Sequence, residues 1–284
     1  MSKDLDIIKN LEYFKDIIDE YHISDDELLR NLNTLKRIHQ SQIKCENCSS
    51  LESCKQYTKG SRLALNYQGI IVQEIEYCDY MLKLKQQQGI LNKYVYCDVP
   101  AKLVDINMQN INYTAEQKQL YLKLGAILTN KEEKGLYICG DLGVGKTYLC
   151  IALANSLVLE NEKVAFLKAS NFFDEMRSLV STDNLLIDKT INKLQRVKYL
   201  FIDDIGSESN SEYVRDKILF RILDYRLENH LTTIFTSNLN KKELLVHYQY
   251  DNKEKSNIMK AKRLLERIDK LTNNHVLDGP NLRK

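Results

Sequence analysis

The chain has 284 residues, of which 43% are hydrophobic and 28% charged, and its formal net charge is +2. This length allows one or two domains with full hydrophobic cores. It contains no run of eighteen or more apolar residues, and its start, MSKDLDIIKN, lacks the basic and apolar regions of a signal peptide. We therefore expect a cytoplasmic protein with no membrane span, in which clustered cysteines indicate metal binding more often than disulfides.

The N-terminal part of the chain is expected to be mainly helical. Apolar residues at helical spacing predict a helix over residues 5–18, and the sequence SDDE at residues 24–27 has the form of a capping box that opens a second helix. Both apolar stripes fit either a local core or a docking face for a partner. Short strand-like runs follow at residues 63–67 and 70–75.

Two domains are expected, residues 1–98 and residues 99–284. The boundary is placed near Val99-Pro100, since proline disfavours helix in the residue before it. Beyond it, strands alternate with helices, which predicts a mostly parallel α/β sheet flanked by helices. The expected elements are helix 115–128, strand 136–139, helix 146–160, strand 163–168, helices 170–180 and 184–195, strand 197–202, helix 211–228, strand 232–236 and helix 257–271.

A phosphate-binding sequence opens this second domain. GDLGVGKT at residues 140–147 follows an apolar strand and begins a helix, so it matches GxxxxGK[ST] in its expected context. Its glycines let backbone N–H groups turn toward phosphate oxygens. Lys146 is predicted to reach the β- and γ-phosphates of ATP, and Thr147 to ligate Mg²⁺. The predicted nucleotide contacts are Gly140, Asp141, Leu142, Gly143, Val144, Gly145, Lys146, Thr147 and Tyr148.

Two acidic residues end the strand-like sequence YLFIDD at residues 199–204. Asp203 fits the acid that holds Mg²⁺, and Asp204 fits the residue that orients or deprotonates the attacking water. Asp204 is one methylene shorter than the glutamate usual in P-loop ATPases of this kind, which favours slow hydrolysis or a water-bridged role. Asn238, at the end of TTIFTSN, is positioned to bond the γ-phosphate or the water, although Ser-Asn also ends many strands as turn chemistry.

A GTPase interpretation competes with this one. Residues 203–206 satisfy DxxG, and residues 240–243, NKKE, come close to NKxD. The final carboxylate of NKxD makes a close bidentate contact with guanine, and Glu243 is a methylene longer than the aspartate that does this. Asn240 and Glu243 are better explained as opening a helix, so we expect ATP as the nucleotide.

Segments of the chain resemble the DnaC/DnaI/IstB group of AAA+ ATPases. They are, in order, GDLGVGKTYLCIALANSL, YLFIDDIGSES, YVRDKILFRILDYRLENHLTTIFTSN, and KAKRLLERIDKL followed by GPNLRK, within residues 100–284. The resemblance implies an arginine finger at Arg267, acting on a neighbouring subunit's γ-phosphate, and a nucleotide-sensing arginine at Arg283. Arg263 is the alternative finger. Helical spacing brings Arg263 near Arg267, where an ordinary solvated basic face is the competing interpretation.

The sequence CENCSSLESC at residues 45–54 supplies three thiols, whereas tetrahedral zinc needs four ligands. Cys78 is the best fourth ligand by spacing, with His39 and Cys97 as alternatives. The front of the chain resembles DnaI-type primosomal proteins, which implies a zinc site with a histidine among its ligands. No histidine lies between residues 40 and 229, so the site here must be all-cysteine or use His39. The predicted zinc ligands are Cys45, Cys48, Cys54 and Cys78.

These features predict an ATP-dependent loader of the replicative DNA helicase, acting in replication initiation and primosome assembly. The resemblance implies that the zinc domain docks on the hexameric helicase, while the AAA+ domain self-associates and binds ATP-Mg²⁺ and single-stranded DNA. Basic residues that favour DNA contact are Lys189, Lys193, Arg196 and Lys198. Two alternatives stay open: an IstB-like transposition helper, a kind that lacks the cysteine module, and a nucleotide-gated adaptor with little turnover.

Overall fold

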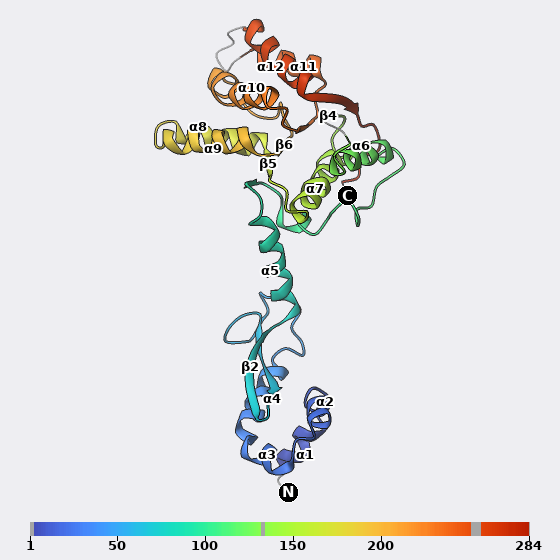
Figure 1. Ribbon diagram of the computed structural model, residues 1–284, viewed down its shortest axis with the longest axis vertical. Coiled ribbons are helices and arrows are strands. Elements are labelled where there is room, and N and C mark those ends of the chain that lie inside the picture. The colour runs from blue at the N-terminus through green and yellow to red at the C-terminus, as the bar shows by residue number, and fades with distance from the viewer. Residues whose placement is uncertain (1–2, 132–133, 251–256, 284) are drawn as a thin grey trace. The chain divides into compact units, whose positions relative to one another are not determined.

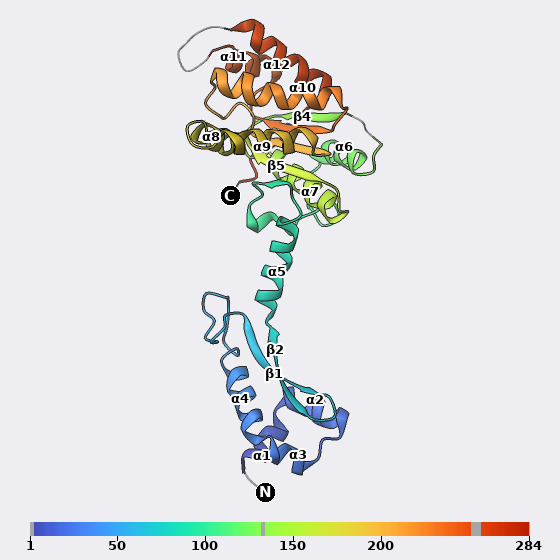
Figure 2. The ribbon, with the colours of Figure 1, turned by 60° about the vertical axis from the view of Figure 1, so that its left-hand side comes forward.

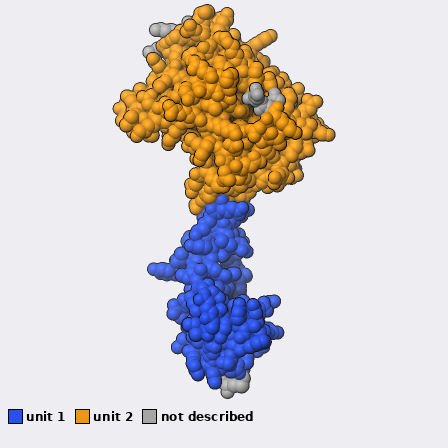
Figure 3. All heavy atoms as spheres, viewed as in Figure 1, with its two compact units in different colours: residues 1–86 blue, residues 87–284 orange. Residues whose placement is uncertain are grey.

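The computed structural model describes residues 3–131, 134–250 and 257–283. The chain divides into two compact units, residues 1–86 and residues 87–284 (Figure 3). We expected the boundary near Val99-Pro100, but the structural division lies earlier. The reason is that Ile90 and Tyr94 are buried in the core of the second unit, and the strand that follows them joins its sheet.

The first unit combines short helices with one β-hairpin. The antiparallel strands pair from Ser61 opposite Tyr77 to Tyr67 opposite Ile71, and β1 lies beside α4 (Figures 1 and 2). An additional helix, α5, was not predicted and continues past the division. The elements are α1 (Lys3–Asn10), α2 (Glu12–Tyr21), α3 (Asp25–Arg30), α4 (Leu32–Ile43), β1 (Ser61–Tyr67), β2 (Ile71–Tyr77) and α5 (Asp79–Leu91).

The helix expected over residues 5–18 is two helices, separated at Leu11, whose ψ of 124° is extended. The break lets Leu5 of α1 and Phe14 of α2 enter one core from different directions. Ser24 caps α3 by accepting the N–H of Glu27. The Glu27 carboxylate accepts the hydroxyl of Tyr67, which ties α3 to the hairpin.

The second unit contains a parallel six-stranded sheet in the order β3-β5-β6-β7-β4-β8. This confirms the predicted parallel α/β architecture. The edge strands β3 and β8 were not predicted, because β3 is very short and β8, TNNHV, is mostly polar. The strands are β3 (Tyr96–Cys97), β4 (Gly135–Cys139), β5 (Val164–Lys168), β6 (Tyr199–Asp203), β7 (Thr233–Ser237) and β8 (Thr272–Val276).

Helices cover both faces of this sheet (Figure 2). The long helix expected over residues 211–228 begins as a π-helical segment, η2 (Tyr213–Leu219), and continues as α10 (Phe220–Glu228). In the parts of the chain that the structure describes, no helix is long and apolar enough to cross a membrane. The helical segments are η1 (Ala101–Leu103), α6 (Lys118–Leu128), α7 (Lys146–Leu159), α8 (Ala169–Leu179), α9 (Asn184–Arg196), η2 (Tyr213–Leu219), α10 (Phe220–Glu228), α11 (Lys241–Gln249) and α12 (Ile258–Leu271).

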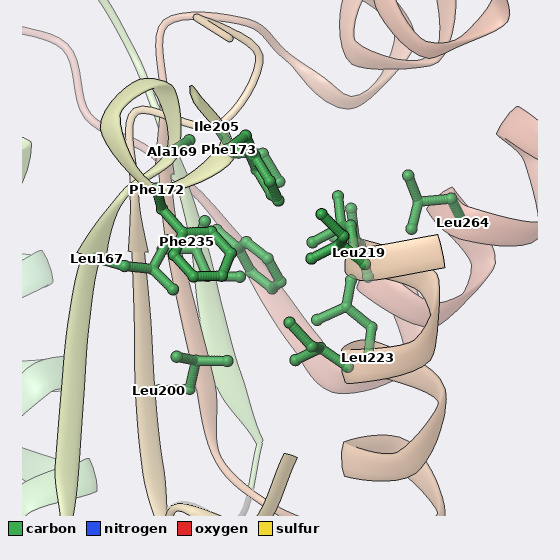
Figure 4. Packing of buried hydrophobic residues seen from close by; sticks show 14 of the residues in the cluster. Leu167, Ala169, Phe172, Phe173, Leu200, Ile205, Leu219, Leu223, Phe235 and Leu264 are labelled. Atoms are coloured by element: carbon green, nitrogen blue, oxygen red, sulfur yellow. The ribbon is translucent and has the colours of Figure 1, made fainter. Parts of the chain in front are cut away.

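The alternation of side chains along the strands creates two cores. In β6, Leu200 and Ile202 face the cluster under α8, α9, α10 and α12, while Tyr199 and Phe201 face the cluster under α6 and α7. Parallel strands that are buried on both faces have nearly continuous apolar sequences. The four inner strands β4, β5, β6 and β7 have such sequences. Figure 4 shows the first cluster, in which Phe172, Phe235 and Leu223 pack between sheet and helices.

Candidate functional site

The loop between β4 and α7 depends on glycines for conformation and for space. Gly143 and Gly145 have φ angles of 83° and 97°, in the region that disfavours side chains. A Cβ atom at Gly143 would lie 2.0 Å from Oδ1 of Asn281, and one at Gly145 would lie 2.3 Å from Nε2 of Gln117. The loop can therefore present its backbone only if these positions carry no side chain.

Lys146 is 7% exposed and lies at the mouth of this loop. Its Nζ donates to the carbonyls of Gly140 and Asp141, at 2.7 and 2.8 Å, and to Oδ1 of Asn238 at 2.9 Å. Burial lowers the pKa of Lys146, and the carboxylates of the neighbouring acidic pair act in the opposite direction. The lysine thus links the phosphate loop to the end of β7.

The two predicted acidic residues lie beside it, at the end of β6. Asp203 is 6% exposed, and its Oδ1 accepts the hydroxyls of Thr147, at 2.7 Å, and Thr236, at 2.6 Å. Burial raises the pKa of Asp203, while these two hydrogen bonds oppose the rise. Asp204 has a φ of 58°, and its Oδ1 accepts Nδ2 of Asn238 at 2.9 Å.

The structure therefore gathers the five polar residues predicted for ATP and Mg²⁺ at the carboxyl edge of the sheet. They are Lys146, Thr147, Asp203, Asp204 and Asn238. Sequence reasoning missed Thr236, which also accepts the N–H of Asp204 at 2.8 Å. Thr236 precedes Asn238 by two residues, and residues at this spacing lie on the same face of a strand. This spacing could have indicated that Thr236 lies near the site.

The C-terminal segment crosses the phosphate loop. The N–H of Leu277 donates to Cys139 O at 2.8 Å, and that of Leu282 donates to Gly143 O at 2.9 Å. Arg283 is exposed, and its charge contributes to the lowered pKa of Lys146. A second residue missed in the sequence, Gln117, donates from Nε2 to Val144 O at 2.8 Å and supports the loop from the start of α6.

The remaining predicted nucleotide contacts lie around the loop. Leu142 is 59% exposed, whereas Val144 is buried. Tyr148 is partly buried and packs against the core beneath α7. Val144 and Tyr148 therefore attach the loop and α7 to the core, whereas Leu142 is largely exposed.

Arg267 lies on α12, where residues of its own chain hold it. Its Nε donates to Oδ1 of Asp224 at 2.9 Å, its Nη1 donates to Oε2 of Glu266 at 3.1 Å, and its guanidinium lies over the ring of Phe220 at 5.0 Å. Arg263, one turn earlier, is exposed. The side chains of the two candidate arginine fingers therefore differ in mobility. Contacts within the chain orient the guanidinium of Arg267, whereas Arg263 projects from the surface.

Asn240 and Glu243 form a reciprocal cap on α11. Oδ1 of Asn240 accepts the N–H groups of Lys242 and Glu243, and Oε2 of Glu243 accepts the N–H of Asn240 at 2.8 Å. This confirms their interpretation as a helix start and accounts for the residues that suggested a guanine-binding motif.

The predicted basic stretch is exposed. Lys189, Lys193 and Arg196 are exposed on α9. Lys198 is paired with Glu162 at 2.7 Å.

The four predicted zinc ligands line one cavity of about 210 Å³ in the first unit; they are Cys45, Cys48, Cys54 and Cys78. Sγ of Cys54 accepts the N–H of Gly60 at 3.4 Å, and backbone hydrogen bonds from Gly60 and Gln56 lower the pKa of this thiol. The alternatives lie elsewhere. Nδ1 of His39 is hydrogen-bonded to the hydroxyl of Tyr13, and Cys97 belongs to β3 in the other unit.

Within the cavity two thiols face other partners. Sγ of Cys45 accepts Nε2 of Gln56 at 3.2 Å, and Sγ of Cys48 donates to Ser50 O at 3.3 Å. Accordingly, among the described residues no group of three or more histidine, cysteine, aspartate or glutamate side chains is arranged to hold a metal ion. The four cysteines thus share one cavity and have the ligand type that zinc takes, but the structure does not arrange them as a metal site.

The fold and the nucleotide site define a P-loop protein of the AAA+ class: a parallel sheet with a phosphate loop after one strand and an acidic pair after another. Family comparison narrows this class. The chain belongs to the family of IstB-like ATP binding proteins, whose pattern matches residues 92–274.

Similarity to individual proteins extends further along the chain. It is 29% identical over 290 residues to the replicative helicase loader DnaI of Bacillus subtilis (strain 168), covering 99% of this chain and 90% of that protein. A crystal structure of DnaI is 30% identical with a TM-score of 0.56, covering 68% of this chain and 99% of that one. A putative primosome component from Streptococcus pyogenes serotype M3 is 27% identical with a TM-score of 0.53, covering 70% and 100%.

Proposed function

We propose that this protein is an ATP-dependent loader of the replicative DNA helicase. One observation carries the proposal: the similarity to the DnaI loader runs through 99% of the chain and so includes the cysteine-bearing first unit. The IstB-like pattern begins only at residue 92. If the protein were a transposition helper of the IstB kind, its first unit would have no role. The presence of this unit therefore favours the helicase-loader function over the transposition function.

In this proposal the phosphates of ATP lie between the backbone of the glycine loop and Lys146. The Nζ of Lys146 exchanges its bonds to the carbonyls of Gly140 and Asp141 for bonds to the β- and γ-phosphate oxygens. Thr147 and Asp203 supply adjacent oxygens, which suit Mg²⁺, since this ion takes one or two protein ligands beside phosphate and water. A Mg²⁺ ion held by Thr147 and Asp203 would supply positive charge to offset the charge that develops during phosphoryl transfer.

Asp204 accepts a hydrogen bond from the attacking water and orients it. The amide of Asn238 holds the same carboxylate, and its oxygen faces Lys146. Arg283 adds positive charge from the C-terminal segment, and Arg267 acts on a neighbouring subunit in a self-associated form. The short reach of Asp204 and the anchoring of Arg267 in its own chain favour slow turnover that partners stimulate.

The first unit is the helicase-docking domain, held by a structural zinc ion on Cys45, Cys48, Cys54 and Cys78. Their shared cavity supports this assignment. The exposed cations of α9 are candidates for contact with single-stranded DNA, since basic side chains pair with phosphates. The proposal places the protein in the cytoplasm, together with the hexameric helicase and the chromosome.

The test combines the full-length chain with the replicative helicase of the same organism, ATP and circular single-stranded DNA. We expect the chain to bind the hexamer and raise the amount of helicase on DNA, and Lys146→Ala to abolish the ATP-dependent part. A chain that neither binds the helicase nor promotes its loading overturns the proposal. Loading without measurable hydrolysis, with or without DNA, selects the nucleotide-gated adaptor instead.

A further inference from the structure

A buried carboxylate closes the turn behind Asp204. Glu208 is 3% exposed, and its Oε2 accepts the N–H of Gly206 at 2.8 Å. Its Oε1 accepts the hydroxyl of Tyr248, a buried residue of α11. Burial and the Glu208 carboxylate raise the pKa of Tyr248, so the hydroxyl keeps its proton and remains a donor. A buried carboxylate needs such donors, because an unpaired charge there is costly.

The turn that Glu208 closes has an unusual backbone. Asp204 and Gly206 have φ angles of 58° and 91°, and the N–H of Ser207 donates to Asp204 O at 3.1 Å. A left-handed aspartate costs on the order of 1–3 kcal/mol and persists only where its surroundings hold it. Thr236 holds Asp204 on the β7 side, through the N–H of Asp204. Glu208 holds the other end of the turn, through Gly206.

The contact between this turn and α11 leaves two buried polar atoms without a hydrogen-bond partner among the described residues, Asn210 Oδ1 and His247 Nε2. His247 Nε2 lies 3.7 Å from Oε1 of Glu208, just beyond hydrogen-bond range. The amide of Asn210 donates to His247 O at 3.0 Å, so the same segment is anchored to α11.

We propose that Glu208 is a positioning residue for ATP hydrolysis. Its carboxylate fixes the turn through Gly206 and anchors it to Tyr248, and in this way sets the direction of the Asp204 side chain. The inference rests on the proposed function in one respect, the role of Asp204 in orienting water. In this proposal Glu208 acts through Gly206 and Tyr248, and not by contact with the nucleotide.

The test compares Glu208→Ala, Glu208→Gln and the control Glu212→Gln, which changes an exposed carboxylate paired with Lys260. Glu208→Ala is expected to lower kcat about 10–100-fold, since misplacing a catalytic group by about 1 Å has this effect. The dissociation constant for ATP should stay within about threefold. Glu208→Gln keeps an acceptor for the N–H of Gly206 and should recover most of the rate, and Glu212→Gln should match the parent chain.

A double variant separates positioning from general damage. If Glu208 acts through Asp204, adding Glu208→Ala to Asp204→Asn should slow turnover no further. The inference is overturned if the reductions in kcat from Glu208→Ala and Asp204→Asn multiply in the double variant. It is also overturned if Glu208→Ala lowers kcat and ATP affinity equally, or leaves kcat unchanged. If Asp204→Asn alone leaves kcat unchanged, the proposed role of Asp204 fails instead. Should Glu208→Ala not fold, Tyr248→Phe is expected to lower kcat several-fold at constant ATP affinity, and an unchanged kcat there also overturns it.

Discussion

The side-chain amide of Asn238 joins two functional residues, donating from Nδ2 to Asp204 Oδ1 at 2.9 Å and accepting Lys146 Nζ on Oδ1 at 2.9 Å. An amide offers both a donor to a carboxylate and an acceptor to an ammonium from one planar group. An aspartate here would repel Asp204, and a serine is too short to reach both. Asn238 therefore links the side chains of Lys146 and Asp204.

Replacing Asn238 with alanine is expected to lower kcat about 10–100-fold while ATP affinity changes only modestly, because Asp204 loses its orientation and Lys146 keeps its phosphate contacts. Steady-state ATPase assays and binding of a fluorescent ATP analogue measure the two effects. Asn192→Ala, at an exposed position on α9, is the control. Loss of ATP binding with an unchanged kcat would show that Asn238 serves the lysine alone.

Cys78→Ser is expected to remove the metal, because three thiols hold zinc far more weakly than four. Elemental analysis should find about one zinc per parent chain, close to none in Cys78→Ser, and an unchanged amount in Cys97→Ser, which alters β3 of the other unit. A chelator should unfold residues 1–86 and leave the ATPase unit folded. A parent chain purified without zinc refutes the site.

Arg267→Ala is expected to bind ATP normally and lose the hydrolysis that self-association stimulates, by a factor of about 10³ or more, as for other arginine fingers. Turnover measured against protein concentration reports this effect. Arg263→Ala is the matched variant, because it removes an exposed cation one turn away. If Arg263→Ala loses the stimulated hydrolysis and Arg267→Ala keeps it, Arg263 is the arginine finger instead of Arg267.

Arg283→Ala is expected to weaken ATP binding about five- to tenfold, since charge-assisted hydrogen bonds of a cation to phosphate contribute about 1.5–3 kcal/mol and this side chain is partly solvated. ADP binding should change less, because ADP lacks the γ-phosphate. Calorimetric titration with both nucleotides measures the difference, and Lys262→Ala, an exposed cation on α12, controls for net charge. Equal losses for ATP and ADP would argue against sensing of the γ-phosphate.

Arg226 is fully buried on α10 and donates to Oγ1 of Thr233 and to the carbonyls of Leu194, Val197 and Thr232. Arg226→Lys should destabilise the second unit by about 3 kcal/mol, because one ammonium cannot satisfy all these acceptors. The expected fall in melting temperature is about 6–12 °C. Arg221→Lys, which changes an exposed arginine paired with Asp188, should melt within about a degree of the parent chain.

The sequence predicted the parallel sheet from strong local signals, and it singled out four of the five polar residues that the candidate site brings together, with a weaker signal at Asn238. Apolar strands between amphipathic helices identify the sheet, and the glycine spacing around Lys146 identifies the phosphate loop. The strand end at Asp203 and Asp204 was equally clear, since adjacent carboxylates after an apolar run need a cation or donors.

The residues that the sequence did not reveal act through tertiary contacts. Gln117 supports the phosphate loop through a hydrogen bond to Val144 O, 27 residues along the chain, and nothing local marks it. Thr236 bonds both Asp203 and Asp204 on the neighbouring strand, and its spacing from Asn238 was its one local signal. Likewise β8 is a polar strand that forms only because β4 offers a free edge. Propensity cannot predict such a strand, because pairing rather than composition stabilises it.

The contact between Gly143 and Asn281 has a consequence for evolution. The space that a side chain at position 143 would need is filled by an amide from the other end of the same unit. The φ of 83° at Gly143 disfavours any side chain whatever the space, whereas the amide of Asn281 lies at the tip of an exposed side chain. Position 143 should therefore remain glycine across relatives, while position 281 is free to vary.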